Sequence, residues 1–219
     1  MDVKLIEILG SDLTVVNAAR VSFDKHHEKF TEGDEKLIKY LASHGHWTPF
    51  GHPQLQFRIS APIFVARQLV KHQVGLVWNE ISRRYVDSKP SFYLTRDWRN
   101  RAENKKQGSG KDLVKLTPEE WESIDNAYKW ASEAYSLLLK RGVAPEQARM
   151  MLPQATYTEW YWTGSLFAFS RVCRLRLTDD AQMETREIAK KISDLINPNF
   201  PISWKHLVKE NSKDVDNNE

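Results

Sequence analysis

Residues 54–60 (QLQFRIS) alternate strictly between polar and apolar side chains. In an extended segment, Leu55, Phe57 and Ile59 share one face, which predicts a half-buried strand. Stretches with helical spacing of apolar residues stand on both sides of it in the sequence. The combination predicts a single α+β domain, rich in helices, with a small and mainly antiparallel sheet.

Start and stop signals place the other elements. The stretch Thr117-Pro118-Glu119-Glu120 is typical of a helix start, because threonine caps, proline suits the first turn and glutamate reaches back to the cap. Asp12 is expected to cap the first helix, and residues 3–9 read as a strand. Helices are expected over 12–20, 31–44, 62–73, 117–140, 145–151, 156–176 and 179–196, with a loop over 76–82.

The domain is expected to span residues 1–209. Within it, the polar stretch at 97–117 is interpreted from its composition as a flexible surface insertion. Residues 210–219 are interpreted as a polar tail.

Cys173 is the one cysteine in 219 residues, which excludes an internal disulfide and a cysteine-based zinc site. A chain without disulfides suits a reducing compartment, and the charged start MDVKLIEILG is unlike a signal peptide. No run of about 18 apolar residues exists that would span a bilayer. We therefore expect a cytoplasmic, intracellular protein that does not bind membranes.

The densest polar cluster runs from Arg67 to Tyr85. Within it, Gln68 stands one helical turn before Lys71 and His72, so the helix end is expected to present several donors together. A loop with an amide, a carboxylate, a hydroxyl and a guanidinium follows. Such polar loops are often ligand sites, but a solvated helix end with capping side chains has the same residue types, and both interpretations stay open.

Three arginines, Arg171, Arg174 and Arg176, lie just before an acidic pair. Taken alone, this stretch is better interpreted as an exposed basic stripe paired with acids. Guanidinium groups also suit bidentate contacts to phosphate and to uracil-like edges. A module that binds single-stranded nucleic acid is the competing hypothesis, but 32 basic against 29 acidic residues, a net charge of +3, argues against it.

The histidines and the cysteine carry weaker signals. His44 and His46 lack the paired carboxylate or cysteine spacing of a metal site, so we interpret them as loop or capping residues and expect no metal. Cys173, inside a predicted helix, is interpreted as a buried structural thiol. No glycine-rich phosphate loop occurs in the chain.

Short motifs over residues 15–205 together resemble those of the flavin-dependent thymidylate synthases. In chain order they are Ala19-Arg20-Val21-Ser22-Phe23, Gly45-His46-Trp47-Thr48-Pro49-Phe50-Gly51-His52, Ala61-Pro62-Ile63-Phe64-Val65-Ala66-Arg67-Gln68, Asn79-Glu80-Ile81-Ser82-Arg83-Arg84-Tyr85, Ala148-Arg149-Met150-Met151-Leu152-Pro153, Tyr161-Trp162-Thr163, Leu175-Arg176 and Ala181-Gln182-Met183-Glu184. One such motif is weak, but all of them in register cover nearly the whole chain.

The resemblance implies the fold of that family and the methylation of dUMP to dTMP. It implies 5,10-methylenetetrahydrofolate as the carbon donor, NADPH-reduced FAD as the hydride source, and a homotetramer with active sites built between subunits. The residues that it implies for dUMP are Gln68, Ser82, Arg84, Arg149 and Arg176, with Arg176 and Ser82 as the catalytic pair. The residues that it implies along FAD or the folate channel are Ser22, His52, Lys71, His72, Gln73, Asn79, Glu80 and Ser165.

The chain departs from the family pattern on the flavin side. Where the family signature begins Arg-His-Arg, this chain has Lys71-His72-Gln73, and one additional residue stands before Ser82. Ser165 replaces an asparagine, and Phe167 replaces an arginine. These departures keep a second hypothesis open, in which the chain is a flavin-binding relative with lost or altered activity.

Overall fold

The computed structural model describes residues 1–103 and 108–209. Its centre is a four-stranded antiparallel sheet in the order β1-β2-β6-β3. The strands of this sheet are β1 (Asp2–Leu9), β2 (Gln54–Pro62), β3 (Leu76–Glu80) and β6 (Tyr157–Ser165). A separate hairpin pairs β4 (Arg99–Arg101) with β5 (Ser109–Leu113). The predicted α+β class with a small antiparallel sheet is confirmed.

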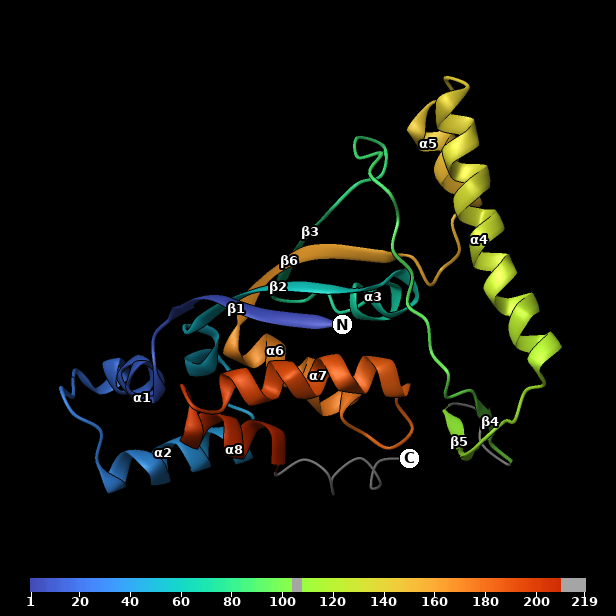
Figure 1. The fold of residues 1–219 in the computed structure, drawn as a ribbon. Coiled ribbons are helices and arrows are strands. Elements are labelled where there is room, and N and C mark those ends of the chain that lie inside the picture. The colour runs from blue at the N-terminus through green and yellow to red at the C-terminus, as the bar shows by residue number, and fades with distance from the viewer. Residues whose placement is uncertain (104–107, 210–219) are drawn as a thin grey trace.

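The helices gather mainly below the sheet in Figure 1, apart from one long arm. They are α1 (Asp12–Arg20), α2 (Glu32–Ser43), α3 (Ile63–Leu69), α4 (Pro118–Lys140), α5 (Pro145–Ala148), α6 (Leu166–Arg176), α7 (Met183–Ile196) and α8 (Pro201–Lys209). Short 3-10 turns are η1 (Val21–Phe23), η2 (Thr48–Gly51) and η3 (Arg149–Met151). None of the helices in the described part of the chain is long and apolar enough to cross a membrane.

The alternation of residues 54–60 turns the apolar side chains of β2 into the hydrophobic core. Phe57 lies opposite Trp162 in the register of β2 and β6, and both side chains are fully buried. Phe169 of α6 meets each of them edge to face, with ring centroids 4.9 and 5.3 Å away. Such pairs add about 0.5–1.5 kcal/mol beyond the burial of their area. The contact fixes α6 beneath the sheet and thereby positions the residues at both ends of that helix.

The arm is built from α4, α5 and η3, which contact one another and stand apart from the sheet in Figure 1. Thr117 caps α4 as predicted: its side chain accepts from the Glu120 backbone, and the Glu120 carboxylate accepts from the Thr117 backbone. Trp130 and Leu137 of α4 are 63% and 56% exposed. Arg149, one of the residues expected to bind dUMP, is therefore carried by an element that stands apart from the sheet and its helices.

Two predictions about secondary structure were wrong near the sheet. The expected helix over 156–176 is strand β6 followed by helix α6, and part of the expected loop over 76–82 is strand β3. The helix α3 also ends at Leu69, earlier than expected. The pairing of β3 with β6 is long-range, and β6 alternates buried and partly exposed residues along its length. The threonine, tyrosine and tryptophan side chains of β6 are of the types favoured in strands, so the expected helix ran against the local composition as well as the tertiary pairing.

Other elements differ in smaller ways. The stretch 97–117 contains the β4–β5 hairpin, and residues 104–107 lie outside the described residues. The helix α8 was not predicted, and the polar tail at 210–219 lies outside the described residues. Ser11, not Asp12, is the N-cap of α1. The buried Asp12 carboxylate instead accepts from the backbone N–H groups of Ile202 and Ser203, both at 2.9 Å, and so caps the start of α8.

Candidate functional site

Three of the predicted site residues meet where the end of α3 approaches the end of α6. Arg176 donates from Nε to the Nε2 atom of His72 at 2.9 Å and from Nη2 to the backbone carbonyl of Gln68 at 3.4 Å. All three side chains are partly buried. Gln68 and Arg176, both predicted for dUMP, are thus brought together across 108 residues of sequence.

His72 is a neutral acceptor in this contact. Burial, together with the positive charges of Arg176 and Arg171, lowers the pKa of His72 to about 4. Because Nε2 accepts from Arg176, the ring proton belongs on Nδ1. The arrangement leaves the charge of Arg176 uncompensated by His72 and available to an anionic ligand.

His72 is expected to titrate near pH 4 in the folded protein, against about 6.5 in an unfolded chain. Since the folded pKa is the lower one, the unfolded state takes up the proton first. The contribution of His72 to the stability of the folded protein therefore declines as the pH falls from about 6.5 to about 4. NMR titration of histidine-labelled protein, assigned with His72→Gln, measures the pKa directly. A His72 midpoint at or above 6.5 would contradict the neutral assignment.

The other side of Gln68 is held by residues that were not among the predicted site residues. Its side-chain Nε2 donates to Gln182, and its Oε1 accepts from the Thr185 hydroxyl at 3.2 Å. Gln182 in turn donates to Glu184, which pairs with Arg99. Gln182 and Glu184 lie in one of the recognised motifs, so a signal existed for them; Arg99 lies in the expected surface insertion and had none.

The other residues predicted for dUMP lie elsewhere in the chain. Ser82 and Arg84 follow β3, where the Ser82 hydroxyl accepts from Nε of Arg84 at 3.3 Å. Arg84 is exposed and lies over the ring of Tyr85, with 5.0 Å from its guanidinium carbon to the ring centroid. Arg149 is exposed on η3 and donates to the Glu146 carbonyl. Among the described residues, no hydrogen bond joins Ser82, Arg84 or Arg149 to Gln68 or Arg176.

Part of the predicted flavin group gathers at the start of α6. Ser165 caps this helix by accepting from the Ala168 backbone at 3.2 Å. Gly75 has φ +76°, and a Cβ placed on it would lie 3.2 Å from that of Ala168, so the loop after α3 packs closely on the helix start. This loop carries Lys71 and Gln73, which are both exposed.

The turn η2 also contacts α6 near its start. Trp47, 53% exposed, packs on Phe167 with ring centroids 5.7 Å apart. His52, directly after η2, is exposed. The predicted flavin residues Lys71, Gln73, Ser165 and His52 thus come from segments that converge on one helix end.

Asn79 and Glu80 belong to β3 and not to a loop. The Glu80 carboxylate accepts from the Thr158 hydroxyl at 2.6 Å and from the Trp78 indole at 3.1 Å. Asn79 lies opposite Tyr161 in the sheet register and is exposed. These two residues are placed by the edge strand that leads to Ser82.

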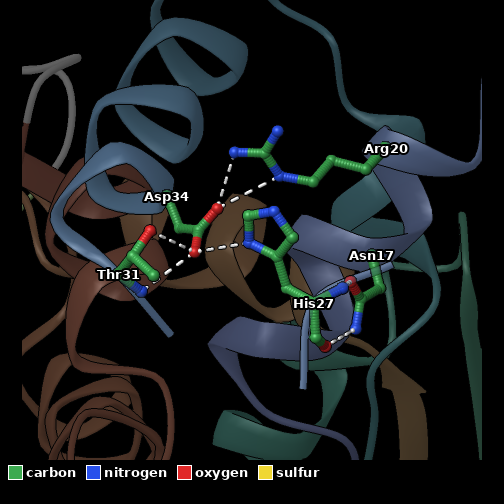
Figure 2. Close-up of polar contacts among 5 residues, drawn as sticks. All are labelled: Asn17, Arg20, His27, Thr31 and Asp34. Carbon is green, nitrogen blue, oxygen red and sulfur yellow. Dashed lines mark hydrogen bonds and ion pairs between the residues drawn. The ribbon is translucent and has the colours of Figure 1, made fainter. Parts of the chain in front are cut away.

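Ser22 lies on η1, between α1 and α2, in a turn fastened by a buried carboxylate (Figure 2). Asp34 accepts from Nη2 of Arg20 at 2.7 Å, and it contacts the His27 ring at 3.0 Å. It also accepts from the Thr31 backbone and hydroxyl. The turn that presents Ser22 is therefore held at both ends by one side chain.

The weaker candidates have structural roles. His44 contacts the Tyr40 carbonyl at 2.9 Å at the end of α2, which confirms the capping interpretation. In the described part of the chain, no group of three or more histidine, cysteine, aspartate or glutamate residues is arranged to hold a metal ion. Cys173 is fully buried, and burial raises the pKa of its thiol, as expected of a structural residue.

The chain resembles known proteins over almost its whole length. Residues 4–202 match the family described as thymidylate synthase complementing protein. A flavin-dependent thymidylate synthase of Thermosipho melanesiensis is 38% identical over 209 residues, which cover 95% of this chain and 90% of the relative. One from Thermus thermophilus is 39% identical over 202 residues, covering 92% of this chain and 73% of the relative.

Solved structures of the UMP/dUMP methylase PolB from Streptomyces cacaoi share the fold. The structure bound with 5-Br dUMP has a TM-score of 0.82 and 32% identity, covering 94% of this chain and 93% of that one. The structure bound with 5-Br UMP has a TM-score of 0.80 and 30% identity, with 94% and 92% covered.

Proposed function

The chain belongs to the thymidylate synthase complementing protein family, and from this premise we propose that it is a flavin-dependent thymidylate synthase that methylates dUMP to dTMP. The observation that carries the proposal is its agreement, over 94% of its length, with the fold of a dUMP methylase solved with a dUMP analogue. The juxtaposition of Gln68 and Arg176 supports it from the geometry. The nucleic-acid-binding hypothesis is not favoured.

The lone cysteine agrees with a route that needs no protein thiol. Methylation at C5 of uracil requires that carbon to become nucleophilic, and a cysteine that adds to the ring is one way to do so. Cys173 is fully buried, its thiol contacts the Ala189 carbonyl at 3.5 Å, and its raised pKa disfavours the thiolate. When bound, a reduced flavin supplies the hydride instead.

The donor set near the start of α6 fits a flavin nucleotide. The exposed Lys71 ammonium and Gln73 amide suit the diphosphate, and the exposed Trp47 offers a planar apolar surface for a ring system. Ser165, His52 and Ser22 complete the proposed flavin and folate side, with NADPH and 5,10-methylenetetrahydrofolate as cosubstrates. Lys71 and Gln73 keep donors where the family has arginines, but they lack the bidentate fork of a guanidinium.

The dUMP residues are proposed to bind opposite ends of the nucleotide. The phosphate is close to doubly negative, so Arg84 and Arg149 with the Ser82 hydroxyl are chemically suited to it. Arg176, whose charge is not neutralised by His72, would stabilise negative charge developing on the uracil ring. Gln68 would contact the nucleotide beside it.

The separation of these residues supports an active site shared between subunits. The Ser82–Arg84 loop and the arm that carries Arg149 stand away from α3 and α6 in Figure 1. Two cavities of about 600 and 1020 Å³ lie beside the β4–β5 hairpin, and neither is lined by Gln68, His72 or Arg176. We propose that the chain forms the homotetramer that the family resemblance implies, in which one subunit's loop and arm complete the site of another.

Purified protein is expected to be yellow and to form dTMP from dUMP only when 5,10-methylenetetrahydrofolate and NADPH are both present. Chromatographic detection of dTMP, with NADPH oxidation followed in parallel, measures the reaction. In a second experiment UMP replaces dUMP, because the structural relative was solved with brominated analogues of both nucleotides. Absence of dTMP at saturating FAD would reject synthase activity, and yellow protein with that result would favour the inactive flavin-binding alternative.

A further inference from the structure

A chain of hydrogen bonds connects the β4–β5 hairpin to Gln68. Arg99 of β4 donates from Nη2 to Oε1 of Glu184 at 2.7 Å. Gln182 donates from Nε2 to Oε2 of the same carboxylate at 3.0 Å. The Oε1 atom of Gln182 then accepts from Nε2 of Gln68. The contacts run through four side chains drawn from β4, the start of α7 and α3.

The direction of every bond in this chain follows from the carboxylate. An ionised carboxylate only accepts, so the NH₂ group of Gln182 must face Glu184 and its oxygen must face Gln68. Gln68 must then turn its own NH₂ group toward Gln182. This orientation leaves the Gln68 oxygen facing Thr185, whose hydroxyl donates to it at 3.2 Å. Two side-chain amides that would otherwise be free to flip are therefore fixed by one charge.

Glu184 is well placed to keep that charge. Its side chain is only 8% exposed and that of Arg99 is 20% exposed. Burial alone would raise the pKa of Glu184, but the bonds from Arg99, its own backbone and Gln182 hold the pKa below its ordinary value. Arg99 is itself fastened in the hairpin by its Nε bond to the Ser109 hydroxyl at 2.7 Å.

The unused hydrogen-bond donor and acceptor of Gln68 explain why this orientation matters. With one N–H given to Gln182 and one lone pair taken by Thr185, the amide keeps one N–H and one lone pair for a ligand. A flipped amide would exchange donor and acceptor at the ligand. A donor of the nucleotide would then face the amide N–H, or an acceptor the amide oxygen, and this pairing is more unfavourable than the loss of the hydrogen bond.

We propose that Glu184, held by Arg99, is a positioning residue that orients the Gln68 amide for dUMP. The inference rests on the proposed function, because it is there that Gln68 contacts dUMP. It adds to that function a link between nucleotide binding and the β4–β5 hairpin, which carries none of the recognised motifs.

The test is Glu184→Gln, which keeps the shape but can donate or accept. The KM for dUMP and the dUMP Kd from calorimetry are expected to rise about 10-fold, the effect of one hydrogen bond, with kcat changed less than about twofold. Thr185→Val, which removes the donor to Gln68, is expected to raise KM in the same direction. Glu187→Gln is the matched control, because Glu187 lies on the same helix in an exposed pair with Lys191 and is expected to leave KM unchanged.

The connection from the hairpin to Gln68 is tested with variants of Arg99. Arg99→Gln is expected to raise KM as Glu184→Gln does, and Arg99→Lys, which keeps the charge, is expected to recover part of the loss. Thermal unfolding without and with dUMP separates a folding defect from a binding defect: the dUMP-induced shift in Tm falls only if binding is impaired.

The outcomes separate this inference from the proposed function. Wild-type protein that makes dTMP, together with Glu184→Gln and Thr185→Val variants of unchanged KM and Kd, overturns the positioning role alone. A fall in kcat at unchanged KM also overturns it. If the wild type makes no dTMP, the function fails, and the calorimetric Kd still decides whether Glu184 acts on dUMP binding.

Discussion

Replacing Arg176 with alanine is expected to weaken dUMP binding about 5- to 150-fold, because a charged hydrogen bond contributes about 1–3 kcal/mol. Two of its N–H donors go to His72 and to the Gln68 carbonyl. In the described part of the chain, its Nη1 atom has no hydrogen-bond partner and remains available. With His72 neutral, the positive charge of Arg176 is also available to the uracil ring.

Calorimetry of flavin-loaded protein measures the change in dUMP affinity, and flavin absorbance reports retention of the cofactor. Arg176→Lys is expected to recover only part of the affinity, since an ammonium cannot reproduce the fork of a guanidinium. Arg174→Ala, two residues earlier and on another face of α6, is the control with unchanged affinity. Loss of flavin together with unchanged dUMP affinity would show that Arg176 serves the cofactor instead.

Replacing Asp34 with alanine is expected to lower the free energy of unfolding by about 3 kcal/mol, as when one partner of a buried ion pair is removed. Figure 2 shows the reason: the fully buried carboxylate joins Arg20, His27 and Thr31. Asn17 completes the turn by exchanging two hydrogen bonds with the backbone of His27. Urea unfolding measures the loss, with Asp194→Ala as control, because its pair with Lys190 is exposed and is worth about 0.5 kcal/mol or less.

This stabilisation is expected to depend on pH in one direction. Burial would raise the pKa of Asp34, but the bonds from Arg20, His27 and Thr31 hold it well below its usual range. Above about pH 4 the group is ionised in both states, and its contribution is complete; at lower pH the unfolded chain takes up the proton first, and the contribution declines. The difference in stability between wild type and Asp34→Ala should therefore shrink as the pH falls below about 4, and a constant difference between about pH 4 and about pH 2.5 would contradict the assignment.

Local sequence signals were sufficient to predict elements whose stabilising contacts join residues close together in the sequence. The cap at Thr117 depends on Glu120 three residues later and formed as predicted. Thr31 and Asp34 form a capping box with the same spacing at the start of α2. The alternation in residues 54–60 formed β2 with Leu55, Phe57 and Ile59 buried.

Tertiary pairing decided what local signals could not. Residues 157–165 are rich in threonine and aromatic side chains, which are favoured in strands, and the segment forms a strand by pairing with β2 and β3. Asp12 has the residue type of a helix cap, but the helix that it caps begins 189 residues later, at Pro201. No window of sequence contains both partners of such contacts.

The candidate site divides in the same way. Short motifs in register were enough to indicate the family and the residue types expected for a dianionic nucleotide. The neutral state of His72 beside Arg176, and the hydrogen bonds from Arg99 and Gln182 to Glu184 that orient the amide of Gln68, become visible in the folded chain alone. Burial and charge act through space, and these partners lie about 100 residues apart and meet when α6 and α7 pack beneath the sheet.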